Sequence, residues 1–144
     1  MSSQIPFTEI VEGLSATTPF VGPETIEREK SRIFEARIGA NESAFGVSPA
    51  AAKAMRDAIQ SASWYGDPEN FDLRKALAEK HGVSMDEVVV GGGIDKLLGL
   101  VVRMIVAPGT PVVTSLGAYP TFNYHVAGFG GKLETVPYSN DHED

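Results

Sequence analysis

Three consecutive glycines between an apolar run and a helical pattern are the residues of this sequence best placed to do chemistry. Gly91-Gly92-Gly93 follows the β-branched run Val88–Val90, and from Asp95 to Val106 apolar residues recur at helical spacing. Residues without a Cβ let a ligand approach the backbone, and the first free amides of a helix form an anion site. The sequence therefore predicts a phosphate site at a strand-to-helix turn.

An aromatic loop follows the next predicted strand. Pro108-Gly109 ends the helix, Val112–Thr114 has the pattern of a second buried strand, and the loop Tyr119–Phe122 comes after it. In a right-handed crossover the glycine turn and this loop both leave the carboxyl edge of a parallel sheet, where open α/β sheets bind ligands. A planar ring that carries a phosphate would fit between them.

Two other phosphate motifs disagree with the spacing. A Walker loop requires Ser or Thr after its lysine, but Leu97 follows Lys96. A dinucleotide fingerprint requires a third glycine where Lys96 stands, and an acidic residue where Ser115 and Leu116 stand. The remaining arrangement, a phosphate at a helix start with an aromatic residue after the neighbouring strand, is typical of pyridoxal phosphate enzymes.

The order of the motifs carries a resemblance. The segments 91–96 and 119–122, with Tyr65-Gly66-Asp67-Pro68 and Asn41-Glu42, are similar to the amino-terminal part of fold-type I pyridoxal phosphate (PLP) aminotransferases, particularly the histidinol-phosphate aminotransferase branch. The similarity covers the chain from about Arg37 onward. It implies an α/β fold: a partial three-layer α/β/α large domain with a mainly parallel sheet, preceded by an irregular N-terminal arm. Ile94 and Lys96 replace the serine and glutamate common in that branch.

The resemblance also implies roles for single residues. The family holds the cofactor phosphate through backbone amides of the glycine turn, stacks an aromatic residue on the pyridine ring, and reaches the phosphate of the neighbouring subunit with a tyrosine. The implied cofactor-binding residues are Gly93, Ile94, Asp95, Phe122 and Tyr65. The loop of Ala40 and Asn41 matches a segment near the substrate, and no catalytic residue or metal ligand is implied within this chain.

Plainer interpretations of the same residues stay open. Trp64 and Tyr65 could plug the core between two helices, and residues 39–43 could be a simple polar turn. Lys96, one turn into a helix, is best interpreted as a surface charge. The apolar residues of segment 7–14 could pack on their own domain or lie across a second subunit, and the resemblance favours the second.

Two parts of the chain are predicted. Residues 1–36 are expected to form the arm, and residues 37–144 the first, incomplete part of the PLP-binding domain. Helices are expected to begin at Pro23 and at Ser48-Pro49, the latter with a core-facing apolar side, and to span Phe71–His81 with Gly82 as a left-handed stop. A short strand is expected at Phe34–Ile38, and the parallel sheet is expected to contain Val88–Val90, Val112–Thr114 and Leu133–Val136.

Composition limits the classes of function. The 144 residues are 42% hydrophobic and 22% charged, which is ordinary for a globular domain. A net charge of −7 argues against a broad electrostatic grip on nucleic acid or an anionic membrane, and the lack of cysteine excludes disulfides and a thiol nucleophile. No apolar run approaches the roughly 18 residues of a membrane span, and no secretory signal pattern is present. A cytoplasmic protein is expected.

The lysines bear on activity, because PLP enzymes bind their cofactor covalently through one. None of the six lysines of the chain matches the family's catalytic position. We therefore expect an amino-terminal portion of an aminotransferase, inactive alone, whose complete form moves an amino group from an amino acid to a 2-oxo acid. The expected assembly is a homodimer with shared active sites. The alternative is a non-catalytic phosphate-ligand-binding or interaction module of the same fold.

Overall fold

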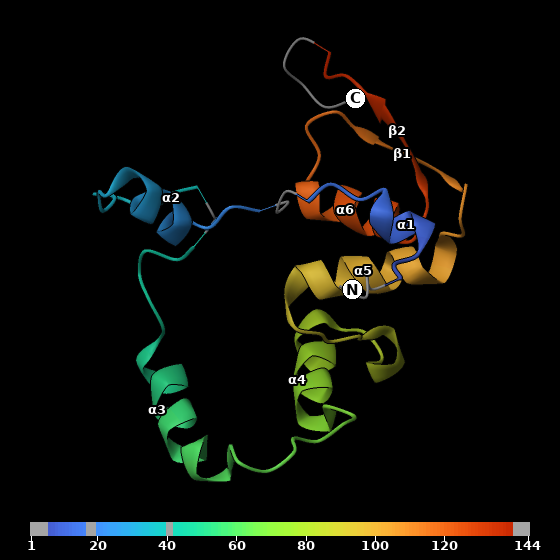
Figure 1. Cartoon of the computed structure of the whole chain (residues 1–144). Coiled ribbons are helices and arrows are strands. Elements are labelled where there is room, and N and C mark those ends of the chain that lie inside the picture. Colours follow the sequence, from blue (N-terminus) through green and yellow to red (C-terminus); the bar gives the residue numbers. More distant parts are fainter. Residues whose placement is uncertain (1–5, 17–19, 40–41, 140–144) are drawn as a thin grey trace. The chain divides into compact units, whose positions relative to one another are not determined.

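The computed structural model describes residues 6–16, 20–39 and 42–139. The chain divides into two compact units (Figure 1), one made of residues 1–26 with 91–144 and the other of residues 27–90. The predicted domain boundary at residues 36 and 37 stays a prediction.

A parallel pair of strands forms the sheet of the first unit. β1 (Pro111–Ser115) and β2 (Lys132–Val136) pair in a register that runs from Pro111 opposite Lys132 to Ser115 opposite Val136. The intervening helix α6 (Pro120–Gly128) makes the crossover that a parallel connection needs, and proline at its first position suits a helix start. The strands predicted at Val112–Thr114 and Leu133–Val136 are confirmed.

Helices cover this strand pair. α6 packs on β2 and on α5 (Gly93–Ile105), and α1 (Glu9–Glu12) lies against α6. Figure 1 shows α6 between α5 and the strands. Among the described residues of this unit, the fully buried side chains are Val102 of α5 and Val126 of α6. The core of this unit therefore lies where the two longer helices meet, and the helix of the arm packs on its own chain.

Two predicted strands are absent from the described residues, and that part of the prediction was wrong. Val88–Val90 pairs with no strand, although the backbone of Val88 is extended (φ −111°, ψ 118°), and Phe34–Ile38 is likewise unpaired. A strand exists only through hydrogen bonds to a neighbour, so β-branched residues alone do not make one. Within the described ranges the parallel sheet has two strands, where three were expected.

The second unit is a series of short helices. α2 (Pro23–Lys30) crosses the boundary between the units at residues 26 and 27. It is followed by α3 (Pro49–Ala58), the 3₁₀ turn η1 (Ile59–Ser61), α4 (Phe71–His81) and the 3₁₀ turn η2 (Met85–Glu87).

The helix ends of this unit follow the sequence signals. The Ser48 hydroxyl oxygen accepts the N–H of Ala51 at 3.2 Å, and Gly82 ends α4 in the left-handed conformation (φ 66°). Ser84 and Glu87 form the expected capping box around η2. These local hydrogen bonds fix the ends of each element without help from distant residues.

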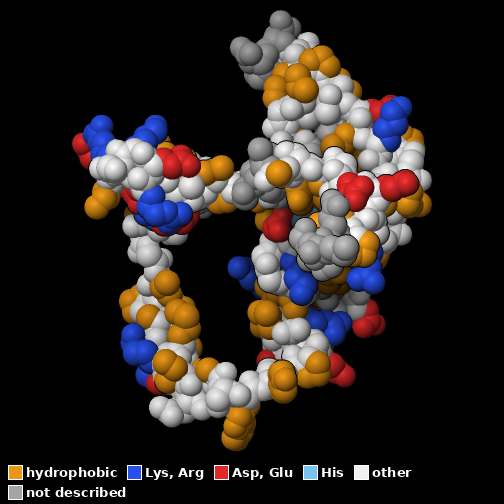
Figure 2. All heavy atoms as spheres, viewed as in Figure 1, with side chains coloured by type: hydrophobic (Ala, Val, Ile, Leu, Met, Phe, Trp, Pro, Cys, Tyr) orange, Lys and Arg blue, Asp and Glu red, His pale blue; other side chains and the backbone are white. Residues whose placement is uncertain are grey.

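The apolar side of α3 is exposed, in contrast to the prediction that it forms core. Met55 is 57% exposed and Ile59, just after the helix, is 67% exposed. Figure 2 shows hydrophobic side chains gathered over α3. Ala78 of α4 is the buried hydrophobic residue among the described residues of this unit. Amphipathic spacing correctly identified a face that requires a partner, but the described part of this unit does not supply one.

Candidate functional site

The first turn of α5 carries two backbone amides without an acceptor inside the helix. The helix begins at Gly93 (φ +84°), two residues earlier than expected, and the Gly93 N–H donates to the carbonyl oxygen of Gly91 at 2.9 Å. Gly92 has no side chain with which to cap the helix. The N–H groups of Ile94 and Asp95 are therefore left without a capping acceptor. Both residues are exposed. An anion could approach these amides at the positive end of the helix dipole.

The first turn of α6 carries the aromatic candidate. Phe122 is partly buried, and its N–H donates to the carbonyl oxygen of Tyr119 at 3.1 Å. On either side of it, Thr121 Oγ1 and Asn123 Oδ1 are buried and have no hydrogen-bond partner. Buried polar atoms are rarely left unpaired in folded proteins. This end of α6 therefore has unused hydrogen-bonding capacity at the two residues that flank Phe122 in the chain.

The two helix starts lie at the same end of the first unit. Near the start of α5, Asp95 accepts a hydrogen bond from His125 of α6 at 3.0 Å. Near the other end of α5, a Cβ at Gly131 would lie 2.7 Å from Val106 and 2.8 Å from Val126. These contacts place the second half of α6 against α5, and Figure 1 shows the two helices side by side and running in the same direction. Because α6 follows β1 in the chain, the start of α6 lies at the carboxyl end of that strand. Parallel sheets bind ligands at this edge.

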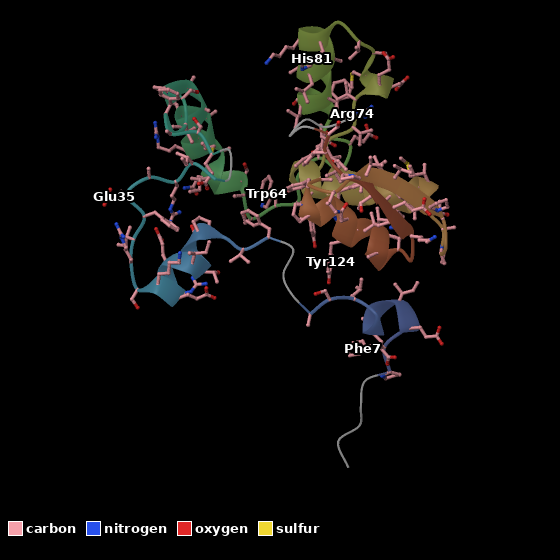
Figure 3. All side chains as sticks on the ribbon, turned by 90° about the horizontal axis from the view of Figure 1, so that it is seen from above. Phe7, Glu35, Trp64, Arg74, His81 and Tyr124 are labelled. Carbon is pink, nitrogen blue, oxygen red and sulfur yellow. The ribbon has the colours of Figure 1, made fainter. Side chains whose placement is uncertain are left out.

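Tyr65 belongs to the other unit. It follows η1, and both it and Trp64 (Figure 3) have highly exposed side chains, so the interpretation of this pair as a core plug was wrong. Two residues later, the Asp67 carboxylate accepts the N–H of Phe71 at 2.7 Å and of Glu69 at 3.0 Å. These bonds, that to Phe71 first, lower the pKa of Asp67 from its usual value of 3.8. Asp67 thus ties the segment of Tyr65 to the start of α4.

Ala40 and Asn41 lie outside the described residues. Lys96 is exposed, as expected for a surface charge. Within the described ranges no group of three or more His, Asp or Glu side chains is arranged to hold a metal ion, and no helix has the length and apolarity needed to cross a membrane.

His125 is a site residue that sequence reasoning missed. Its contact with Asp95 joins two helices 30 residues apart, which no local pattern reveals. One signal was present in the sequence: Gly99 stands in the middle of a helix, where glycine is unfavourable unless something packs closely against it. The imidazole of His125 is what packs there.

Comparison with known proteins places this arrangement in a family. No protein-family model matches the chain. A histidinol-phosphate aminotransferase of Anaeromyxobacter sp. (strain Fw109-5) is 35% identical over 127 residues, which cover 86% of this chain and 35% of that protein. Histidinol-phosphate aminotransferase 2 of Nitrosospira multiformis is 35% identical over 108 residues, covering 73% of this chain and 28% of that protein.

A solved structure agrees with these relatives. The crystal structure of histidinol-phosphate aminotransferase from Sinorhizobium meliloti, in complex with pyridoxal-5'-phosphate, superposes with a TM-score of 0.90 at 53% sequence identity. The match covers 99% of this chain and 38% of that one. The chain thus spans about a third of the length of the curated relatives it matches.

The chain therefore belongs to the fold-type I PLP-dependent aminotransferases. Within that class it is histidinol-phosphate aminotransferase-like, and it represents part of the fold, with helices around a small parallel sheet. The expected α/β fold class is confirmed.

Proposed function

We propose that this chain is the amino-terminal portion of an aminotransferase and supplies part of its PLP site. The observation that carries the proposal is that α5, whose first turn holds the two unused amides of Ile94 and Asp95, and α6, whose first turn holds Phe122, begin at the same end of the first unit. A phosphate group and a planar ring are the two parts of PLP that these features would bind. The relative from Sinorhizobium meliloti holds that cofactor.

The residues present fit the cofactor. Gly93, with its positive φ and no atom within 4 Å of an added Cβ, leaves space beside the amides of Ile94 and Asp95 for a phosphate. The face of Phe122 would orient the ring. Bound PLP would supply the electron-withdrawing ring that carries an amino group between an amino acid and a 2-oxo acid. These residues would bind and orient that ring and keep water from one face.

The other parts of the proposal concern the whole protein. The complete protein would be a homodimer with shared active sites. In it, the Tyr65 hydroxyl would donate a hydrogen bond to the cofactor phosphate of the second subunit. The side chain of Tyr65 is exposed and so is accessible for that role. Ala40 and Asn41 would lie near the substrate. The substrates would be small molecules: an amino donor, which is an amino acid or histidinol phosphate, and a 2-oxo acid. The protein would act in the cytoplasm, and the net charge of −7 favours a protein that binds neither nucleic acid nor an anionic membrane.

The test uses the complete gene product. The reading frame beyond Asp144 should encode a lysine in a loop rich in Ser and Thr. The purified protein should take up PLP, and adding histidinol phosphate or another amino donor should change the visible absorbance of the cofactor. Addition of a 2-oxo acid should then restore the original spectrum. A protein that takes up no PLP would overturn the proposal, and one that binds PLP without any spectral response to amino donors would be the non-catalytic module.

A further inference from the structure

A hydrogen bond joins the candidate phosphate site to the neighbouring helix. His125 Nε2, on α6, donates to Asp95 Oδ1 in the first turn of α5 at 3.0 Å. The side chain of His125 is only 26% exposed, while that of Asp95 is 55% exposed. The imidazole is therefore largely held by its surroundings, whereas the carboxylate lies at the surface, so the histidine is the fixed partner of the pair.

Gly99 explains why the imidazole is fixed. A Cβ at this position would lie 2.8 Å from His125 Cε1 and 3.0 Å from Nδ1, too close for any other residue without movement of the ring. Glycine in the middle of a helix is less favourable than alanine, so its presence here calls for a packing reason. The ring thus rests on the backbone of α5 one turn after Asp95, and two independent features, a hydrogen bond and a close fit, determine its position.

The position of the Asp95 carboxylate affects anion binding. The Asp95 N–H is one of the two unused amides at this helix start, so the negative side chain belongs to a residue that would itself bind a phosphate. Like charges repel, and a phosphate monoester carries more than one negative charge at neutral pH. A carboxylate that turned back toward its own helix start would compete for the amides and repel the ligand.

We propose that His125 is a positioning residue that holds the Asp95 carboxylate against α6 and away from the amides of the α5 start. His125 and Phe122 are three residues apart on α6 and so share a face of that helix. One face of α6 would thus orient the cofactor ring through Phe122 and clear the phosphate site through His125. This inference rests on the proposed function, because it concerns the same cofactor.

A double-mutant cycle on the complete gene product tests the inference, with equilibrium binding of PLP as the readout. His125→Ala should weaken PLP binding by about tenfold, because the carboxylate is released toward the phosphate. In the Asp95→Asn variant residue 95 carries no negative charge that His125 could hold away from the phosphate. His125→Ala should therefore change the affinity for PLP less than twofold in that variant. Equal losses in the two backgrounds would show that His125 acts only through packing and would overturn the inference.

Gly99→Ala provides a second test that leaves both polar residues in place. The added Cβ should displace the imidazole and weaken PLP binding severalfold, even though alanine favours the helix and the apo protein need not lose thermal stability. Gly128→Ala, on α6, is the matched control because a Cβ there meets no atom within 4 Å, and it should leave PLP affinity unchanged. Unchanged affinity in Gly99→Ala would contradict the inference.

The two proposals fail in different ways. If the wild-type protein takes up no PLP, both the proposed function and the role of His125 fall. If it takes up PLP normally and the cycle shows no coupling between His125 and Asp95, only the role of His125 falls.

Discussion

Phe122 is the single residue on which the placement of the cofactor ring depends. Its ring is partly buried in the first turn of α6, so an aromatic ligand could stack on the face that remains open. Replacing Phe122 with Ala in the complete gene product should weaken PLP binding by about 1 kcal/mol, which is roughly fivefold in the dissociation constant. Titration of the apo protein with PLP, followed by absorbance, measures this change.

The control for this substitution lies at the other end of the same helix. Phe129 is of the same residue type, but it follows the last residue of α6 and so lies at the opposite end of the helix from Phe122. Phe129→Ala should leave PLP affinity unchanged, whatever it does to stability. If Phe122→Ala also binds PLP with wild-type affinity, Phe122 does not contact the cofactor.

Asp67 makes a prediction about pH. Backbone N–H groups of Phe71 and Glu69 favour its charged form and lower its pKa below 3.8. A carboxylate with a lowered pKa in the folded state stabilises that state above pH 3.8, and the contribution is lost as the pH falls through the lowered value. An NMR titration of the side-chain carboxyl should therefore give a pKa below 3.8 in the folded protein. A value at or above 3.8 would mean that the two hydrogen bonds do not persist in solution.

At the residue scale, local motifs could be predicted and long-range partners could not. The glycine turn and the capping residues Ser48 and Ser84 depend on neighbours within a few positions, which the sequence displays. The partner of His125 lies 30 residues away, and its geometry depends on how α5 packs against α6. The roles of Gly93, Ile94, Asp95, Phe122 and Tyr65 stay predictions, because they concern a ligand.

Among the elements, α4 is connected to the segment that follows it through one side chain. Arg74 donates from Nε to the carbonyl oxygen of Val88 at 3.0 Å and from Nη2 to that of Met85 at 2.6 Å (Figure 3 labels Arg74). Arg74→Met keeps much of the side-chain volume but removes both hydrogen bonds. It should lower the free energy of unfolding by about 1 to 3 kcal/mol, because two part-buried carbonyls lose a charged donor. Urea denaturation of the complete gene product measures the change.

The corresponding control is Arg103→Met. Arg103 is exposed and lies in the last turn of α5, where it interacts with the helix dipole rather than with a buried carbonyl. Its replacement should change stability by less than 1 kcal/mol. Equal effects of the two substitutions would show that Arg74 contributes no more than a surface charge.

The elements that the sequence failed to predict share one property. Val88–Val90 and Phe34–Ile38 have strand-forming residues but no neighbouring strand among those described, and the apolar side of α3 has no surface to cover it. Helix α4 was predicted to the residue and α5 to within two residues at its start and one at its end, because the hydrogen bonds of a helix are internal. Sequence patterns therefore predicted the self-contained elements and overestimated those that need a partner.

For the molecule as a whole, the order of motifs was more informative than any single pattern. The glycine turn, the aromatic loop and the Tyr65 segment identified the fold-type I class, which the 53% identity to a solved aminotransferase confirms. The division into units was not predictable in the same way. The first unit combines residues from both ends of the chain. Such an arrangement depends on tertiary contacts, which produce no periodic pattern in the sequence.

The exposed apolar side of α3 leads to a prediction for the isolated chain. Met55 and Ile59 are four residues apart, so they share one face, and both are more than half exposed. Apolar surface of this kind favours association with other apolar surface. Residues 1–144 expressed alone should therefore self-associate, with a mass by light scattering that rises with concentration above the 15.4 kDa of a single chain.

Charge and hydrophobicity can be separated with two variants of the isolated chain. Met55→Glu combined with Ile59→Glu adds two negative charges and removes the apolar face, whereas Arg56→Glu makes the same change of −2 in net charge on α3 and leaves Met55 and Ile59 intact. If the apolar face drives association, the double variant should shift the protein toward monomer and Arg56→Glu should not. An equal shift in both variants would assign the effect to net charge, and a compact, monodisperse monomer of the unmodified chain would contradict the prediction outright.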